Sequence, residues 1–192
     1  MENSNEVRQL SKAFSKLKEI YYYNEVIRHS YFKKKYKILN NNKISILIPT
    51  YNRSKLLFER ALPSIIDQTY QNYEIIIIGD CCTDNTFKKL SELKNDKIKF
   101  FNLPSRKKNY PDQPFYHWLA GPVNALNKAL TFVTGDWIAR IDDDDIWTKN
   151  HLEILLNFSI KGDYDFVSSD YIYYENGVKK INSQKDSHPA IG

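Results

Sequence analysis

Four consecutive aspartates, Asp142 to Asp145, are the residues of this sequence best suited to chemistry. They follow the apolar run 137–141 and precede Ile146-Trp147, so they lie where a buried strand is expected to end. Two carboxylates about 4 Å apart repel each other by roughly 4 kcal/mol at the effective dielectric of a protein surface. A bound divalent cation relieves that repulsion, and carboxylate oxygens suit Mg²⁺ or Mn²⁺. The run therefore predicts a metal site, and the alternative is a solvated loop in which Asp145 caps a following helix.

The spacing within the run indicates which aspartates act together. Side chains alternate along an extended chain, so Asp142 and Asp144 are expected on one side and Asp143 and Asp145 on the other. Two carboxylates on one side leave room for water and phosphate oxygens around a cation. We therefore expect Asp142 and Asp144 to be the metal ligands, and Asp145 to serve the next helix.

The elements that must position this run alternate between strand and helix from Lys43 onward. Short apolar runs predict the strands, and apolar residues three and four apart predict the helices between them. This order implies an α/β fold, with a mostly parallel, Rossmann-like sheet covered by helices on both faces. The segment 104–120 is expected to be a functional or mobile loop. The predicted strands are 44–48, 73–78, 98–101 and 137–141, and the predicted helices are 54–68, a helix after 83–86, and 122–132.

Polar residues gather where the predicted strands end. Ligands of such sheets bind beyond the carboxyl ends of the strands, so these residues should form the site. The sequence lacks the two common glycine-rich phosphate loops and holds only six glycines, so a bound phosphate needs a bridging cation. The strand-end segments are Pro49-Thr50-Tyr51-Asn52-Arg53, Gly79-Asp80 and the acidic run.

Residues 1–42 are predicted to form an N-terminal helical appendage, separate from a domain spanning 43–192. Within 4–37, apolar residues recur alternately three and four apart, which indicates an amphipathic helix. Residues 1–42 hold nine Lys or Arg and four Glu, and nine minus four equals the whole formal charge of +5. The helix either packs on the domain or contacts a partner helix or an anionic membrane surface.

Several classes of protein are excluded or disfavoured by composition. No apolar run is long enough to cross a bilayer, and the polar start lacks the order of a secretory signal. Cys81 and Cys82 are adjacent, which excludes a disulfide framework. We expect a cytoplasmic protein, with attachment to the inner face of the membrane as the alternative. Nucleic acid is not an expected partner, because no recognised binding motif accompanies the basic charge.

Four segments, in this order, resemble glycosyltransferase family 2, an inverting family with the GT-A fold. The match covers roughly residues 43 to 170, and the resemblance implies a GT-A-type sheet that binds a sugar nucleotide. The four segments are Ser45-Ile46-Leu47-Ile48-Pro49-Thr50-Tyr51-Asn52-Arg53, Ser64-Ile65-Ile66-Asp67-Gln68-Thr69-Tyr70, 74–86 with its Gly79-Asp80-Cys81-Cys82-Thr83-Asp84, and 126–145, which ends in the acidic run.

The resemblance also implies roles at matching positions. Asp80 would accept a hydrogen bond from the base, from the N3–H if the base is uracil. Asp142 would reach the ribose or the metal, and Asp144 would bind the metal that bridges the diphosphate. Asp84 is expected to cap a helix rather than contact the ligand. The residues expected to surround the nucleotide sugar are Pro49, Thr50, Tyr51, Arg53, Asp80, Asp142 and Asp143.

The sequence departs from the family pattern at two places. Leu126 stands before Asn127 where the family often has an arginine, so Arg106, Lys107 or Lys108 could contact the diphosphate instead, with a solvated basic run as the alternative. Inversion also needs a carboxylate base, and the family's base segment is not recognised here. Asp170 is the weak candidate, with a surface residue at a strand end as the alternative. We expect the chain to be truncated before that segment.

These observations predict a glycosyltransferase. It would move a sugar, with inversion and a divalent metal, from a nucleoside-diphosphate donor to a glycan or lipid-linked acceptor. UDP is the expected nucleotide. The alternative is a non-catalytic nucleotide-sugar-binding module, or a fragment of a larger transferase. A nucleotidyltransferase of the pyrophosphorylase kind is disfavoured, since 49–53 is not the glycine-rich, basic loop that such an enzyme needs.

Overall fold

The computed structural model describes residues 41–106 and 114–182, with the backbone alone over 114–120. From Asn42 onward these residues belong to the second of the two units into which the chain divides, Asn42–Gly192. The predicted helix 4–37 lies outside the described residues, as do Lys107 and Lys108. Within the described ranges, no helix is both long and apolar enough to span a membrane.

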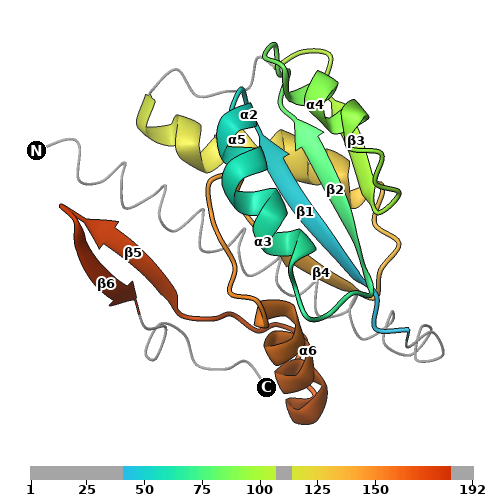
Figure 1. The fold of residues 1–192 in the computed structure, drawn as a ribbon, viewed down its shortest axis with the longest axis vertical. Helices are drawn as coiled ribbons and strands as arrows, with labels where there is room; N and C mark the ends of the chain where they lie inside the picture. The colour runs from blue at the N-terminus through green and yellow to red at the C-terminus, as the bar shows by residue number, and fades with distance from the viewer. Residues whose placement is uncertain (1–40, 107–113, 183–192) are drawn as a thin grey trace, which may run out of the picture. The chain divides into compact units, whose positions relative to one another are not determined.

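Four parallel strands form the central sheet, in the order β3-β2-β1-β4 (Figure 1). After β1 the chain builds outward through β2 and β3, and it then returns to the other side of β1 to form β4. The strand order therefore reverses between β1 and β4, where α/β sheets of this kind bind their ligands. The strands are β1 (Ile44–Thr50), β2 (Tyr73–Gly79), β3 (Ile98–Asn102) and β4 (Trp137–Arg140).

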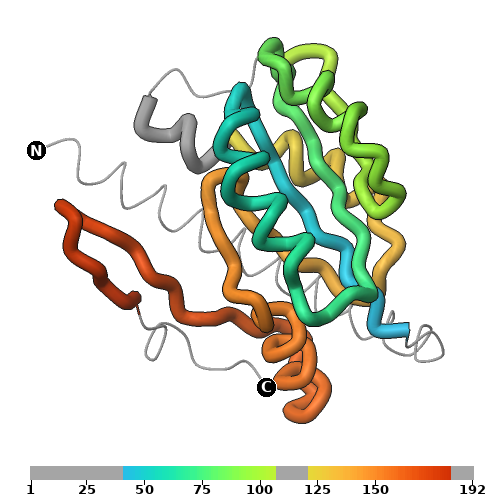
Figure 2. The backbone as a smooth tube through the Cα atoms, in the orientation of Figure 1, coloured from blue at the N-terminus to red at the C-terminus, as the bar shows by residue number. Residues whose placement is uncertain are grey.

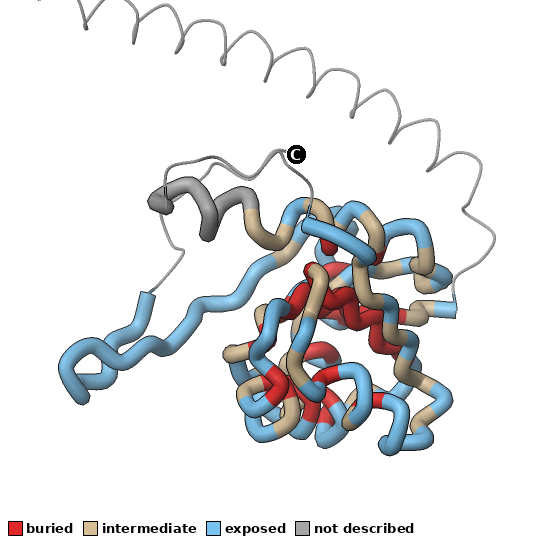
Figure 3. The backbone as a smooth tube through the Cα atoms, turned by 90° about the horizontal axis from the view of Figure 1, so that it is seen from above, coloured by how far each residue is buried: buried red, intermediate tan, exposed pale blue. Residues whose placement is uncertain are grey.

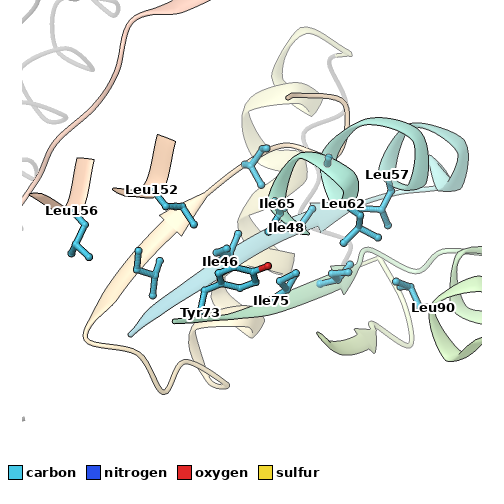
Figure 4. Close-up of a cluster of buried hydrophobic side chains, with 14 residues drawn as sticks. Ile46, Ile48, Leu57, Leu62, Ile65, Tyr73, Ile75, Leu90, Leu152 and Leu156 are labelled. Atoms are coloured by element: carbon cyan, nitrogen blue, oxygen red, sulfur yellow. The ribbon is translucent and has the colours of Figure 1, made fainter. Parts of the chain in front are cut away.

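Helices cover both faces of this sheet, which confirms the predicted fold class. One face of β1 and β2 packs against η1 and α3, together with α4 and α6 (Figure 4). The other face packs against α5, through Ala125 and Ala129. Every residue of β1 and β2 is buried, as their continuous apolar sequences predict for strands covered on both sides (Figure 3). The helices are α2 (Ser54–Leu56), η1 (Leu57–Ala61), α3 (Leu62–Ile66), α4 (Thr86–Glu92), α5 (Pro114–Leu130) and α6 (His151–Gly162).

The helix predicted over 54–68 is present from Ser54 to Ile66, and its middle turn, η1, is a π-helix. Pro63 follows directly, within the first turn of α3. Proline has no N–H to donate to the preceding turn, and its ring presses on the carbonyl four residues back in a regular α-helix. The wider π turn before Pro63 relieves that crowding without ending the helix.

The predicted loop 104–120 is wrong from Pro114 onward, because α5 begins there and not at Pro122. Pro122 lies inside the helix, where proline is unfavourable, so the sequence pattern placed the helix start at that residue. Packing of Ala125 and Ala129 against β1 and β2 stabilises α5 in spite of the lost hydrogen bond. Tertiary contacts outweigh the local preference here.

A hairpin that the sequence analysis did not predict follows α6. Its strands, β5 (Tyr171–Glu175) and β6 (Val178–Asn182), pair antiparallel across the turn Asn176-Gly177. Both turn residues have positive φ, 51° and 77°, which is the type I′ geometry that an Asn-Gly pair favours. That dipeptide, between the aromatic run 171–174 and the short segment 178–182, was the missed signal. Every residue of the two strands is exposed (Figure 3).

A buried carboxylate, Glu74, joins the amino-terminal ends of the strands. Its Oε1 accepts hydrogen bonds from Ser45 Oγ at 2.7 Å and from the Thr134 N–H and Oγ1 at 2.8 Å, and its Oε2 pairs with Lys99 Nζ at 2.8 Å. Burial alone would raise the pKa of Glu74, but the hydrogen bonds from Lys99, Ser45 and Thr134 outweigh it and lower the pKa from 4.5 to about 2.

Glu74→Gln should therefore destabilise the protein at neutral pH, because an amide N–H₂ replaces an acceptor that faces only donors. We expect a loss of roughly 2–3 kcal/mol, less than for a fully buried ion pair, because the lysines are partly exposed. The folded-state pKa lies below the unfolded value, so the carboxylate's contribution is complete above about pH 4.5 and disappears as the pH falls toward 2. Urea unfolding of both proteins at pH 7 and pH 3 measures this.

The control is Glu92→Gln, which removes an exposed carboxylate on α4. Its free energy of unfolding should match the wild type at both pH values. A Glu74→Gln loss that is the same size at pH 3 as at pH 7 would contradict the assigned role of the charge.

Candidate functional site at the carboxyl ends of the strands

The acidic run forms a tight turn and not an extended chain. The Asp142 carbonyl accepts a hydrogen bond from the Asp145 N–H at 3.2 Å, so the expected alternation of side chains is wrong. Asp143 and Asp144 instead share one partner, since Arg53 Nη1 lies 3.3 Å from Asp143 Oδ1 and 2.6 Å from Asp144 Oδ2. Asp142 pairs separately with Arg140 Nη2 at 2.7 Å.

Asp143 is the buried member of the run, with 4% of its surface exposed. Thr50 Oγ1, on the last residue of β1, donates a hydrogen bond to its Oδ2 at 2.7 Å. Burial raises the pKa of Asp143, while the Thr50 bond and the Arg53 charge oppose that rise. Asp143 therefore ties the end of β1 to the turn after β4, directly across the point where the strand order reverses.

Asp142 and Asp144 are accessible, with side chains 47% and 40% exposed, and Asp145 is exposed as well. Arg140 is the cationic partner of Asp142, and Arg53 is that of Asp144. Partial burial lowers the pKa of Arg53, but the charges and hydrogen bonds of Asp143 and Asp144 outweigh it, so that the pKa is raised overall. The turn thus presents the carboxylates of Asp142, Asp144 and Asp145 to solvent, and the first two already bind cationic side chains.

A second group of residues lies at the end of β2. Asp80 is buried, and its Oδ2 accepts a hydrogen bond from Arg106 Nε at 2.9 Å. The Arg106 guanidinium also lies 3.8 Å from the centre of the half-exposed Tyr51 ring. The structure therefore places Arg106 beside Asp80 and Tyr51. This geometry does not favour the prediction that Arg106 contacts the diphosphate. Leu126 packs against the core under α5.

Two asparagines that the sequence analysis gave no role hold these strand ends in place. Asn52 has a positive φ of 51°, and its Oδ1 accepts hydrogen bonds from the N–H groups of Thr83 and Asp84 at 2.8 and 3.2 Å. Asn102 at the end of β3 bonds both the N–H and the carbonyl of Cys82. Asparagine tolerates left-handed backbone and pairs with nearby main chain, which is the signal that Asn52 carried.

Asp84 caps helices, as predicted, and it caps two of them. Its Oδ1 accepts hydrogen bonds from the N–H and Oγ1 of Thr86 at the start of α4, at 3.1 and 2.6 Å. Its Oδ2 accepts the N–H of Ser54 at the start of α2, at 3.0 Å. Burial would raise the pKa of Asp84, but these hydrogen bonds lower it overall. One carboxylate thereby fixes two helix ends beside the site.

The remaining predicted residues, Pro49, Asp145 and Asp170, lie farther from the centre of the site or make other contacts than expected. Pro49 is buried within β1, which runs through it to Thr50, so it can shape the site only through its neighbours. Asp145 does not cap the next helix, because α6 begins later, at His151, with Asn150 at its N-cap position. The orange tube in Figure 2 follows the chain from the end of β4 into α6. Asp170 is exposed and directly precedes β5, outside the four-stranded sheet. Its role as a base stays a prediction.

The donor set at the turn fits a hard divalent cation only if other ligands complete the shell. Among the described residues, no three His, Cys, Asp or Glu side chains gather as a metal site. Asp142 and Asp144 supply carboxylate oxygens of the kind that Mg²⁺ or Mn²⁺ prefers. Mg²⁺ is usually held by one or two carboxylates together with substrate phosphates and water. The two aspartates match that pattern and not a metal cage made by protein alone.

Comparison with known proteins identifies the family of this chain. The model of the family described as glycosyl transferase family 2 matches residues 45–111 and 117–190. An uncharacterized glycosyltransferase of Rickettsia conorii is 36% identical over 147 residues, which cover 76% of this chain and 22% of that protein. The Escherichia coli UDP-Glc:alpha-D-GlcNAc-diphosphoundecaprenol beta-1,3-glucosyltransferase WfgD is 30% identical over 133 residues, which cover 69% of this chain and 47% of that protein.

Solved structures extend the likeness to the fold. Residues 1–349 of S. aureus TarS, in complex with UDP, match with a TM-score of 0.52 and 26% identity, over 62% of this chain and 32% of that one. The chain spans less than half the length of either curated relative named above. The family model nevertheless covers most of this chain, and the parallel sheet with its acidic turn agrees with it. The chain belongs to glycosyl transferase family 2.

Proposed function

We propose that this chain binds a UDP-sugar at the point where the strand order reverses, together with Mn²⁺ or Mg²⁺, and takes part in transferring the sugar with inversion. The hydrogen bond between Thr50 and Asp143 is the main support for the proposal, because it brings the end of β1 and the acidic turn after β4 into one site. The end of β2 joins that site through the bonds of Asn52 to Thr83 and Asp84.

The base end of the donor is proposed to lie against Tyr51 and Asp80. A buried carboxylate at a strand end can accept the N3–H of uracil, and a half-exposed aromatic ring offers a stacking face. The names of similar proteins support a uridine nucleotide. TarS has been solved with UDP and with UDP-GlcNAc, and the E. coli relative is named as a user of UDP-Glc.

The diphosphate is proposed to lie near Asp142 and Asp144. These carboxylates repel a diphosphate directly, so a divalent cation held by Asp142 and Asp144 would supply the positive charge that the diphosphate needs. When bound, such an ion stabilises the charge that develops on the departing nucleoside diphosphate. Arg53 then has to share or leave Asp144, because its guanidinium lies 2.6 Å from that carboxylate.

The acceptor is proposed to be a glycan or a lipid-linked sugar. The E. coli relative is named for a GlcNAc-diphosphoundecaprenol acceptor, and such a substrate would bring this chain to the inner face of the membrane. Asp170 is the candidate base, and its exposed place outside the central sheet favours the alternative of a nucleotide-sugar-binding part of a larger transferase. Transfer of labelled sugar by the 192-residue chain decides between them, since a binding part alone transfers none.

Asp144→Ala should weaken metal-dependent UDP binding by about 10- to 100-fold, the range typical for disturbing a metal site. Isothermal titration of UDP, without metal and with Mn²⁺ at roughly 1 mM, measures the two affinities. Asp96→Ala is the matched control, because it removes an exposed aspartate in the loop before β3, away from the carboxyl ends of the strands. Equal UDP affinity of the unchanged protein with and without metal would sink the metal assignment.

Asp80→Asn should reduce the preference for UDP over CDP. The asparagine keeps the shape but loses the charge that accepts uracil N3–H, and a hydrogen bond to a charged group contributes about 1.5–3 kcal/mol. We therefore expect the ratio of CDP to UDP dissociation constants to fall by about 10-fold or more. A ratio that stays constant while both affinities change would mean that Asp80 supports the pocket without reading the base.

A further inference from the structure

Gln68, just past the end of α3, is buried with 3% of its surface exposed, and its amide contacts the chain on both sides of the α6 start. Nε2 donates hydrogen bonds to the carbonyls of Ser64 at 2.9 Å and Thr148 at 2.7 Å. Oε1 accepts the N–H of Leu152 at 3.0 Å. Both ends of the amide are thus used, and two of its three partners belong to the segment that follows the acidic turn.

Neighbours of Gln68 hold the same segment. Ser64 Oγ accepts the N–H of Trp147 at 3.2 Å, and the N–H of Thr69 donates to the carbonyl of Lys149 at 2.8 Å. The main chain from Trp147 to Leu152 is therefore fixed to the end of α3 by the side chains of Ser64 and Gln68 and by the N–H of Thr69. These bonds lie on the carboxyl-terminal side of the acidic turn (Figure 1).

The amino-terminal side of the turn is fixed independently. The N–H of Ile141 donates to the carbonyl of Leu47 in β1 at 3.2 Å, and Asp143 is held by Thr50. Only Asp144, Asp145 and Ile146 stand between the Thr50 contact and the Trp147 contact. The position of Asp144 is therefore set by two anchors, one on β1 and one at the end of α3.

We propose that Gln68 is a positioning residue for the cation and diphosphate end of the site, acting through the segment 147–152 on Asp144. The inference rests on the proposed function, because it assigns Gln68 an effect on metal-dependent nucleotide binding. A glutamine suits this position because it donates to two main-chain carbonyls and accepts from one main-chain N–H. An apolar side chain of equal length does neither, and leaves the buried Leu152 N–H without its acceptor.

The test compares Gln68→Met with the unchanged 192-residue chain. Mn²⁺ is titrated at fixed UDP concentration, and UDP binding is also measured without metal. Residues that hold metal ligands in place typically contribute 10- to 100-fold to metal affinity, so Gln68→Met should raise the Mn²⁺ concentration for half-maximal UDP binding by about 10-fold or more. UDP binding without metal should stay unchanged, because Tyr51 and Asp80 have no contact with this segment among the bonds described above.

Ile44→Ala is the control for lost stability. Ile44 is buried at the amino-terminal end of β1, at the opposite end of the sheet from the site. It should lower Tm at least as much as Gln68→Met and leave the Mn²⁺ midpoint unchanged when both are measured below Tm. Ser64→Ala removes the acceptor for Trp147 on the same anchor and should shift the Mn²⁺ midpoint in the same direction, by less. It decides the question if Gln68→Met does not fold.

The outcomes separate this inference from the function on which it rests. An unchanged Mn²⁺ midpoint in Gln68→Met, or in Ser64→Ala if the first variant does not fold, overturns the positioning role and leaves the proposed function intact. An equal shift in Ile44→Ala also overturns it, because general destabilisation then explains the effect. If the unchanged chain shows no metal-dependent UDP binding, the proposed function fails, and this inference fails with it.

Discussion

The burial of the Asp143 carboxylate is the constraint on which the arrangement of the strand ends depends. A charged group removed from water is costly unless it is hydrogen-bonded and paired. Thr50 and Arg53 provide those partners, and both come from the segment that ends β1. The requirement to satisfy one buried carboxylate therefore forces the turn after β4 against β1. The same geometry leaves Asp142 and Asp144 facing solvent.

Much of the fold was predictable, because its information is local and periodic. The isoleucine-rich runs of β1 and β2 could only be strands buried on both faces, and the alternation with helices implied a parallel sheet. The errors came where tertiary packing competes with a local rule. Pro122 indicated a helix start and instead lies within α5, and the Asn176-Gly177 turn was a local signal that was overlooked.

The site was predictable in composition but not in geometry. Residue types at strand ends identified Asp80 and the acidic run, because any parallel sheet brings those ends together. The sequence could not predict which aspartate is buried, since that depends on Thr50 and Arg53, some 90 positions away in sequence. Asn52, Asn102 and Gln68 escaped notice for a related reason. Their side chains bond main-chain groups of distant segments, and a main-chain partner leaves no trace in the sequence.

The ion pair between Arg53 and Asp144 has a consequence for how strongly a donor can bind. In the proposed function, the ion pair competes with the metal for Asp144. The apparent dissociation constant of the donor is then the intrinsic constant divided by the fraction of molecules in which Asp144 is available. Both side chains are substantially exposed, and such a pair is worth at most about 1 kcal/mol. The competition therefore costs no more than about sixfold in affinity. In return, Arg53 and Arg140 offset two of the four negative charges of the turn between successive ligands.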